Sequence, residues 1–235
     1  MAVEADWPDA AVYDAYVRGL PRPKVPKAAF TRFPAWMWRN SEVTAFLKRL
    51  KAINAGIGDP ERRCGFYGLD VYSLSASIEA VLNYLDKVDP ESAGIARERY
   101  GCLAPWRADP VRYGRMALSR GYAVCEKPVA DALLDLLKKR LDYLIRDGEA
   151  FFSAEQNARI VAAAEQYYRV MYYGDAVSWN LRDQHMSIWG NWPIALSPNL
   201  VLIALVSAGL VGVFFGYYPA RRASMMNPID ALRYE

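Results

Sequence analysis

Histidine and cysteine are scarce in this chain. Among 235 residues there is one histidine, His185, and there are three cysteines. Cys64, Cys102 and Cys125 are odd in number and show no Cys-x-x-Cys spacing, which argues against a disulfide framework and against a zinc site. We therefore expect reduced, packed thiols, and we expect neither a metal nor a cofactor.

Several catalytic signatures are also absent. The sequence has no Gly-x-Ser-x-Gly elbow, no phosphate-binding loop, no dinucleotide glycine fingerprint and no His-Glu-x-x-His pair. The formal net charge is only +3, and the basic residues are scattered among acids, so we expect no nucleic-acid partner. Glu4, Asp6 and Asp9 interrupt the opening residues, and no apolar stretch follows a basic start, so a signal peptide is not expected.

The first part of the chain alternates between strand and helix patterns. A short apolar run at residues 2–5 predicts a strand, and Pro8 suits the start of the helix that follows. A second strand is predicted at 65–69, ending at Asp70, with another helix from Ser73. Between the strands, a helix from Ser41 is expected to bury one face: Val43, Phe46, Leu47, Leu50 and Ile53. This order predicts a parallel α/β layer.

Beyond Pro128 the pattern becomes wholly helical. A stripe predicted to end near Asp147 contains Ala130, Leu133, Leu134, Leu137, Leu141, Leu144 and Ile145. Ser153 and Gln156 have capping-box spacing and predict the start of a second helix, so the two helices are expected to pack as an antiparallel pair.

A run without charged side chains extends from Leu200 to Tyr218. As a helix, about 19 residues at roughly 1.5 Å each nearly cross a hydrocarbon core of about 30 Å, so the run predicts a transmembrane helix. Small residues recur every four positions and suggest packing against other transmembrane helices: Ala204, Ala208, Gly212 and Gly216. The alternative is a buried helix of a water-soluble core.

Polar residues are predicted at the carboxyl ends of the strands, where α/β proteins commonly have their active sites. Glu4 and Asp70 are expected at the carboxyl ends of the two strands, with Tyr72 close by. The alternative for each carboxylate is an ordinary acid near a helix start. His185 is a candidate general base, and its alternative is a structural or surface histidine.

The chain resembles the erythromycin esterase family over residues 1–186. The matching segments are Ala2–Ala10, Trp36–Asn40, Gly65–Ser73, Glu155–Ala158 and Arg182–Met186. The resemblance implies hydrolysis of a macrolide lactone or another ester by activated water, without a covalent serine. It also implies catalytic roles for Glu4 and His185, with Asp70, Tyr72, Trp38 and Arg182 binding the substrate or supporting the site. Trp36 and Trp38 either wall the pocket or pack in the core.

The chain also departs from that family. Members begin with a Gly-Glu-x-x-His-Gly segment before the position of Val3, and they continue well beyond the position of Met186. We therefore expect a truncated hydrolase with little or no turnover. The predicted fold is α/β and predominantly helical, with few parallel strands and one C-terminal transmembrane helix.

The end of the chain resembles MacB-type exporter permeases over about residues 192–235. The resemblance includes Phe214–Ala223 and Asn227–Glu235. It divides the chain into a hydrolase domain at 1–186, a junction at 187–198 and a permease-like helix and tail at 199–235. Two other interpretations stay open: a component or fragment of an exporter, and a junction that has no evolved joint function.

The basic residues on either side of the apolar run predict the orientation of such a helix in the membrane. Arg221 and Arg222 follow the apolar run, whereas only Arg182 lies near its start. The basic residues thus predict a single-pass membrane protein with a cytoplasmic C-terminus. The side on which the N-terminal domain lies stays open, and the chain is expected in the cytoplasm if the tail does not insert.

Overall fold

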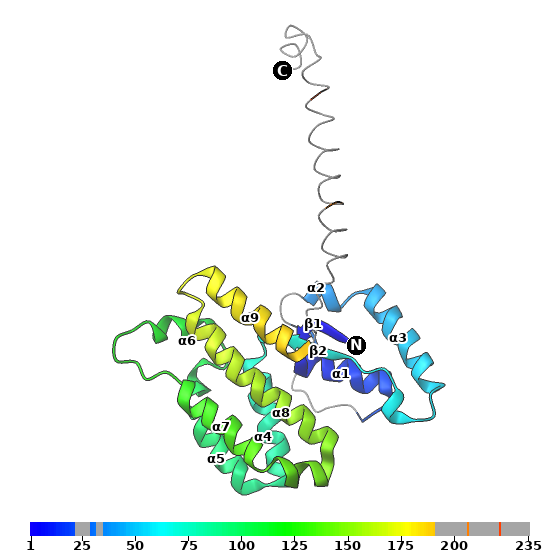
Figure 1. The fold of residues 1–235 in the computed structure, drawn as a ribbon, viewed down its shortest axis with the longest axis horizontal. Helices are drawn as coiled ribbons and strands as arrows, with labels where there is room; N and C mark the ends of the chain where they lie inside the picture. The colour runs from blue at the N-terminus through cyan, green and yellow to red at the C-terminus, as the bar shows by residue number, and fades with distance from the viewer. Residues whose placement is uncertain (22–28, 32–34, 191–205, 207–220, 222–235) are drawn as a thin grey trace. The chain divides into compact units, whose positions relative to one another are not determined.

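The structure, a computed structural model, describes residues 1–21, 29–31 and 35–190, with Val206 and Arg221 (Figure 1). The chain divides into two compact units, Met1–Asn191 and Trp192–Glu235. The domain limits predicted above remain predictions. The elements of the first unit are β1 (Ala2–Asp6), α1 (Trp7–Arg18), α2 (Ala35–Trp38), α3 (Ser41–Ala55), a 3-10 turn (Pro60–Arg62), β2 (Tyr67–Asp70), α4 (Leu74–Val88), α5 (Pro90–Tyr100), a second 3-10 segment (Gly101–Trp106), α6 (Pro110–Ala117), α7 (Glu126–Lys138), α8 (Arg140–Val170) and α9 (Asp175–Gly190).

The two strands form a parallel pair beside α1. Ala2 lies opposite Tyr67 and Val3 opposite Gly68, and the register shifts once before Asp6 meets Asp70. Gly68 permits this close approach, because a Cβ atom there would lie 2.4 Å from the backbone oxygen of Ala5. Within the described residues the fold is therefore mostly helical with a small parallel sheet, as the sequence predicted.

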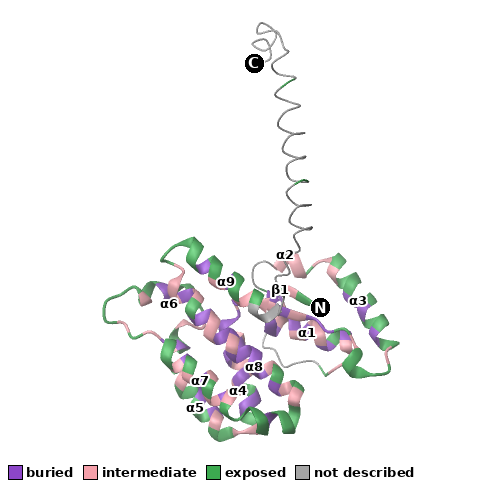
Figure 2. Cartoon of the chain, in the orientation of Figure 1, coloured by how far each residue is buried: buried purple, intermediate pink, exposed green. Residues whose placement is uncertain are grey.

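Two hydrophobic clusters hold this unit together. The larger one lies among α4, α5, α7 and α8, on which Figure 2 marks buried residues, and it includes Ile78 and Val161. The smaller one packs α1 and α3 against the sheet around Phe66 and Leu47. Asn54 of α3 strengthens the second cluster, because its side-chain amide donates to the carbonyl oxygens of Val17 and Cys64, each at 2.9 Å.

The helical pair after Pro128 differs from the prediction. The helix is interrupted at Lys139, so the expected first helix is split between α7 and the start of α8. The backbone leaves the helical region again at Asp147, whose carboxylate accepts a hydrogen bond from the Ala150 N–H at 3.0 Å. Asp147, and not Ser153, thus caps the following helical stretch. In the stretch before Asp147, Leu141 and Ile145 are 76% and 86% exposed, so they are not part of a buried stripe.

Helix α3 begins where the sequence predicted, but its predicted buried face is only partly buried. Leu47 and Leu50 are buried, whereas Phe46 and Ile53 are 42% and 56% exposed. Asn40 is the residue that caps α3, because its side-chain oxygen accepts from the Val43 N–H at 2.8 Å.

The structure corrects the membrane part of the predicted fold class. In the stretches that the structure describes, no helix combines the length and the apolar character that crossing a bilayer requires. Helix α8 has 31 residues, but charged side chains such as Glu155 and Arg169 recur along it. The described residues therefore give no support to the predicted transmembrane helix or to the single-pass membrane location. The run Leu200–Tyr218 itself lies outside the described residues, apart from Val206.

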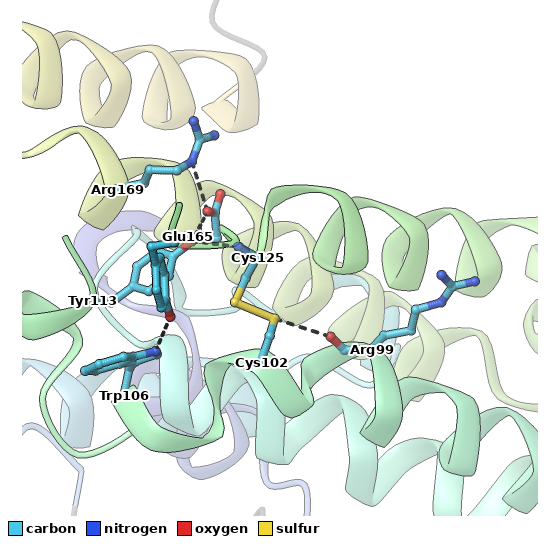
Figure 3. Close-up of a disulfide and its surroundings, with 8 residues drawn as sticks. Arg99, Cys102, Trp106, Tyr113, Cys125, Glu165 and Arg169 are labelled. Atoms are coloured by element: carbon cyan, nitrogen blue, oxygen red, sulfur yellow. Dashed lines mark hydrogen bonds and ion pairs between the residues drawn. A yellow bond between two sulfur atoms is a disulfide. The ribbon is translucent and has the colours of Figure 1, made fainter. Parts of the chain in front are cut away.

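The expectation of reduced thiols is wrong for two of the three cysteines. Cys102 and Cys125 form a disulfide, with their Cα atoms 5.9 Å apart (Figure 3). Beside it, the Tyr113 hydroxyl accepts from the Cys125 N–H at 2.9 Å and donates to the buried carboxylate of Glu165. Arg169 in turn donates to Glu165 at 2.9 Å. The disulfide therefore fixes the start of α7 next to a buried polar network.

Reduction of the oxidised chain is expected to lower its free energy of unfolding by about 3 kcal/mol, because cross-linking residues 23 positions apart limits the unfolded chain. Urea unfolding with and without a phosphine reductant measures the change. A Cys64→Ser variant, in which only the exposed cysteine is replaced, should respond like the parent chain. A transition that does not move on reduction of the parent would contradict a stabilising disulfide.

Candidate functional site

Two carboxylates lie at the same edge of the small sheet. Glu4 lies in β1 and Asp70 ends β2, and because the strands are parallel, their carboxyl ends meet on one side. The two side chains differ in environment: that of Asp70 is 7% exposed and that of Glu4 is 57% exposed. One carboxylate is therefore held inside the protein, and the other faces solvent.

Arg182 of α9 joins these carboxylates. Its Nε atom donates to Asp70 Oδ1 at 3.0 Å and its Nη2 atom donates to Asp70 Oδ2 at 2.9 Å. Nη2 also donates to Glu4 Oε1. The two hydrogen bonds to Asp70 form a bidentate ion pair between the planar guanidinium and one carboxylate. A bidentate pair is stronger than a pair joined by a single hydrogen bond. The hydrogen bonds with Asp70, more than those with Glu4, raise the pKa of Arg182, so the cation persists despite its burial.

Aromatic rings surround the same guanidinium. Its carbon lies 5.3 Å from the ring centre of Tyr72 and 5.5 Å from that of Trp179. Burial raises the pKa of the Tyr72 hydroxyl, and a hydrogen bond with Tyr167 raises it further, so Tyr72 stays neutral. Trp179 was not among the predicted site residues. Its position three residues before Arg182 on one helix is the signal that identifies it.

His185 lies one helical turn beyond Arg182 and is partly buried. Burial lowers its pKa to about 4, although the nearby negative charge of Asp70 acts in the opposite direction. The imidazole is therefore neutral at pH 7 and is able to accept a proton, but it is a weaker base than an exposed histidine.

Trp38 contacts the backbone of Glu4. Its indole N–H donates to the Glu4 backbone oxygen at 3.2 Å, and its ring packs against Phe30 and Phe66. The hydrogen bond and the ring contacts are both structural. Trp38 therefore holds β1 in place, and its role as a wall of the substrate pocket remains a prediction.

The pKa of His185 is open to direct measurement, because the chain contains no other histidine. We expect its imidazole proton signals to titrate near pH 4. An unfolded histidine titrates near pH 6.5, so the unfolded chain binds a proton first as the pH falls. The contribution of the neutral imidazole to stability is complete above pH 6.5 and is lost as the pH falls towards 4.

The size of that loss is at most about 3 kcal/mol, because each pKa unit corresponds to about 1.4 kcal/mol, and partial exposure reduces it. His185→Gln has no group that titrates at this position, so its stability should fall less over the same pH range. NMR titration of the untagged chain near pH 6.5 would contradict the buried position of the ring.

The described side chains suggest no metal site. Among them, no group of three or more histidine, cysteine, aspartate or glutamate residues is placed to hold a metal ion. Glu4 and Asp70 instead share a cation from the protein itself, the guanidinium of Arg182. The site that results consists of two carboxylates, one bridging arginine and one neutral histidine.

Solved structures show the same fold at low sequence identity. A succinoglycan biosynthesis protein matches with a TM-score of 0.52 and 18% identity, over 79% of this chain and 43% of that chain. A Bacillus cereus protein matches with a TM-score of 0.54 and 19% identity, with the same coverage. This chain thus spans less than half the length of either structure, and at such identity the likeness concerns the fold alone.

Short matches to macrolide export ATP-binding/permease proteins MacB also occur. The Rhodopirellula baltica protein is 59% identical over 44 residues, which is 19% of this chain and 6% of that protein. The Syntrophobacter fumaroxidans protein is 53% identical over 45 residues, again 19% and 6%. These matches are partial, so they give only weak support to the predicted joining of a hydrolase with a permease segment.

A sequence profile described as erythromycin esterase matches residues 1–192. This match covers most of the chain and contains the strands, the bridging arginine and His185. The chain belongs to the erythromycin esterase family.

Proposed function

We propose that this chain hydrolyses an ester, such as a macrolide lactone, with water activated at the strand-end site. The observation that carries the proposal is the bridge from Arg182 to both Glu4 and Asp70, with His185 on the next turn of α9. Membership of the erythromycin esterase family supports the class of reaction. The substrate within that class is not identified by the site.

The proposed roles follow from the environment of each group. Oε1 of Glu4 is held by Arg182, and its second oxygen has no hydrogen-bond partner in the described part of the chain. That oxygen accepts a proton from water as the water oxygen adds to the ester carbonyl carbon. The proton then passes to the alcohol oxygen as the ester C–O bond breaks. Acid and alcohol are the products, and Glu4 is regenerated.

The remaining groups position the substrate and the water and stabilise the charge that develops during the reaction. The guanidinium of Arg182 places positive charge beside the oxyanion that develops on the carbonyl oxygen. Asp70 keeps this guanidinium fixed through two hydrogen bonds. The neutral imidazole of His185 accepts a hydrogen bond from the water, and Tyr72 and Trp38 border the substrate.

We also propose that turnover is slow. Proton transfer is most efficient when the pKa of the base lies near the working pH, and that of His185 lies near 4. The neutral imidazole of His185 is therefore a weak base at pH 7.

Hydrolysis assays on the full chain test this proposal. We expect release of 4-nitrophenol from 4-nitrophenyl acetate, or a ring-opened macrolide one water heavier by mass spectrometry, above the buffer rate. The turnover number should lie well below about 10 per second, the median for enzymes. Absence of hydrolysis above buffer for esters of both kinds would refute the activity. A turnover number of about 10 per second would refute the slow-turnover part.

A further inference from the structure

Two adjoining surface cavities lie beside the contact between helices α1 and α3. One has a volume of about 520 Å³ and the other about 570 Å³, and both are lined by Tyr13, Thr44 and Lys48. Volumes of roughly 300–1,000 Å³ are typical of small-molecule sites. We call this pair of cavities the α1–α3 groove. It contains none of the candidate catalytic residues.

The groove lies along the polar side of α3, next to the face of the helix that is buried against the smaller cluster. At its C-terminal end, Asn54 donates to the carbonyl of Val17 at 2.9 Å, which holds α3 to α1. At its start, Asn40 caps the helix. Between these points α3 turns Thr44, Lys48 and Lys51 towards the groove, and such side chains do not form a close apolar contact. The groove therefore stays open beside the cluster that buries Leu47 and Leu50.

The two walls of the groove differ in character. Val12 and Leu47 supply apolar surface, and Tyr13 and Tyr16 add aromatic rings. Burial raises the pKa of Tyr13, so this ring is neutral at physiological pH. The apolar wall suits the body of a small organic molecule, and a flat ring fits best beside two tyrosines.

The charge along the groove has one sign. Arg39, Lys48 and Lys51 line it, and in the described part of the chain none of the three pairs with a carboxylate. Lys51 instead lies 4.2 Å from the ring centre of Tyr16.

Two nearby carboxylates have partners outside the groove. Asp14 pairs with Arg18 and accepts from the Phe66 N–H at 2.8 Å, and Glu42 accepts from the Ser41 hydroxyl at 2.9 Å. Asp9 acts on Tyr13 with the opposite charge, but the groove itself is lined by three cations and by no carboxylate, which favours an anionic ligand.

We propose that the α1–α3 groove binds a small organic anion. The apolar body of the ligand lies against Tyr13, Tyr16 and Leu47, and its anionic head lies at Lys48 and Lys51. A carboxylate, a sulfonate and a phosphate monoester share this chemistry. The inference does not depend on the hydrolytic activity, because none of the proposed catalytic groups takes part.

Binding of naphthalene-1-sulfonate to the full chain, followed by NMR or calorimetry, tests the proposal. Lys48→Gln/Lys51→Gln is expected to weaken binding roughly tenfold, because each exposed ion pair contributes up to about fivefold in affinity. Lys87→Gln/Lys138→Gln removes the same charge from exposed positions on α4 and α7 and should leave the affinity unchanged. Equal weakening in both double variants would overturn the proposal.

A second variant separates shape from charge. Thr44 is exposed and lines both cavities, so Thr44→Trp should fill the groove and abolish binding without altering the net charge or the fold. Naphthalene-1-methanol, which is neutral, should bind at least tenfold more weakly than the sulfonate. Unchanged binding to Thr44→Trp, equal binding of the neutral compound, or no binding of the sulfonate at 1 mM would each overturn the proposal.

Discussion

Arg182→Met is expected to lower the free energy of unfolding by about 3–5 kcal/mol, because removing one partner of a buried ion pair leaves the other charge without compensation. The partner left behind is Asp70, whose side chain is only 7% exposed. Glu4 also loses a contact, but it faces solvent and is readily hydrated. Urea unfolding followed by circular dichroism at 222 nm measures the change.

A matched control is available on α5. Arg97 pairs with Asp86, and both side chains are largely exposed, so Arg97→Met should cost less than about 1 kcal/mol. The double variant Arg182→Met/Asp70→Asn should be less destabilised than Arg182→Met, because it no longer contains a buried unpaired carboxylate. If Arg182→Met costs no more than Arg97→Met, the buried bridge is not formed in solution.

The strand ends could be predicted from the sequence, and the bridge between them could not be derived from local patterns. Glu4 and Asp70 each belong to a short apolar run before a helix start, a pattern that places carboxylates at the edge of a parallel sheet. Arg182 lies 112 positions from Asp70, so no periodicity connects them. Only the family resemblance indicated that Arg182 supports the site.

Other features depended on contacts between distant segments. Cys102 and Cys125 are 23 positions apart, and their spacing matches no short motif, so their pairing was missed. The break at Lys139 falls among residues that all favour helices, and tertiary packing decides it. Likewise, Phe46 and Ile53 follow helical spacing but lie away from the cluster that buries Leu47. Periodicity located these helices without fixing which side of each is covered.

Glu4→Gln is expected to reduce ester hydrolysis by about 10²- to 10⁴-fold, the usual contribution of a general acid–base group. Glutamine has nearly the same shape, and its side-chain oxygen still accepts a hydrogen bond from Arg182. It has no basic oxygen to take a proton from water. Because Glu4 is mostly exposed, the substitution should leave the fold intact, and the loss of rate should not reflect unfolding.

Glu42→Gln is the matched control, since Glu42 is an exposed acid in the first turn of α3 whose carboxylate accepts from Ser41. The most direct measurement is the initial rate of 4-nitrophenyl acetate hydrolysis by the parent chain, Glu4→Gln and Glu42→Gln at equal folded concentration. The strand-end site predicts that Glu4→Gln falls to the buffer rate while Glu42→Gln matches the parent. Parent-like hydrolysis by Glu4→Gln would contradict it.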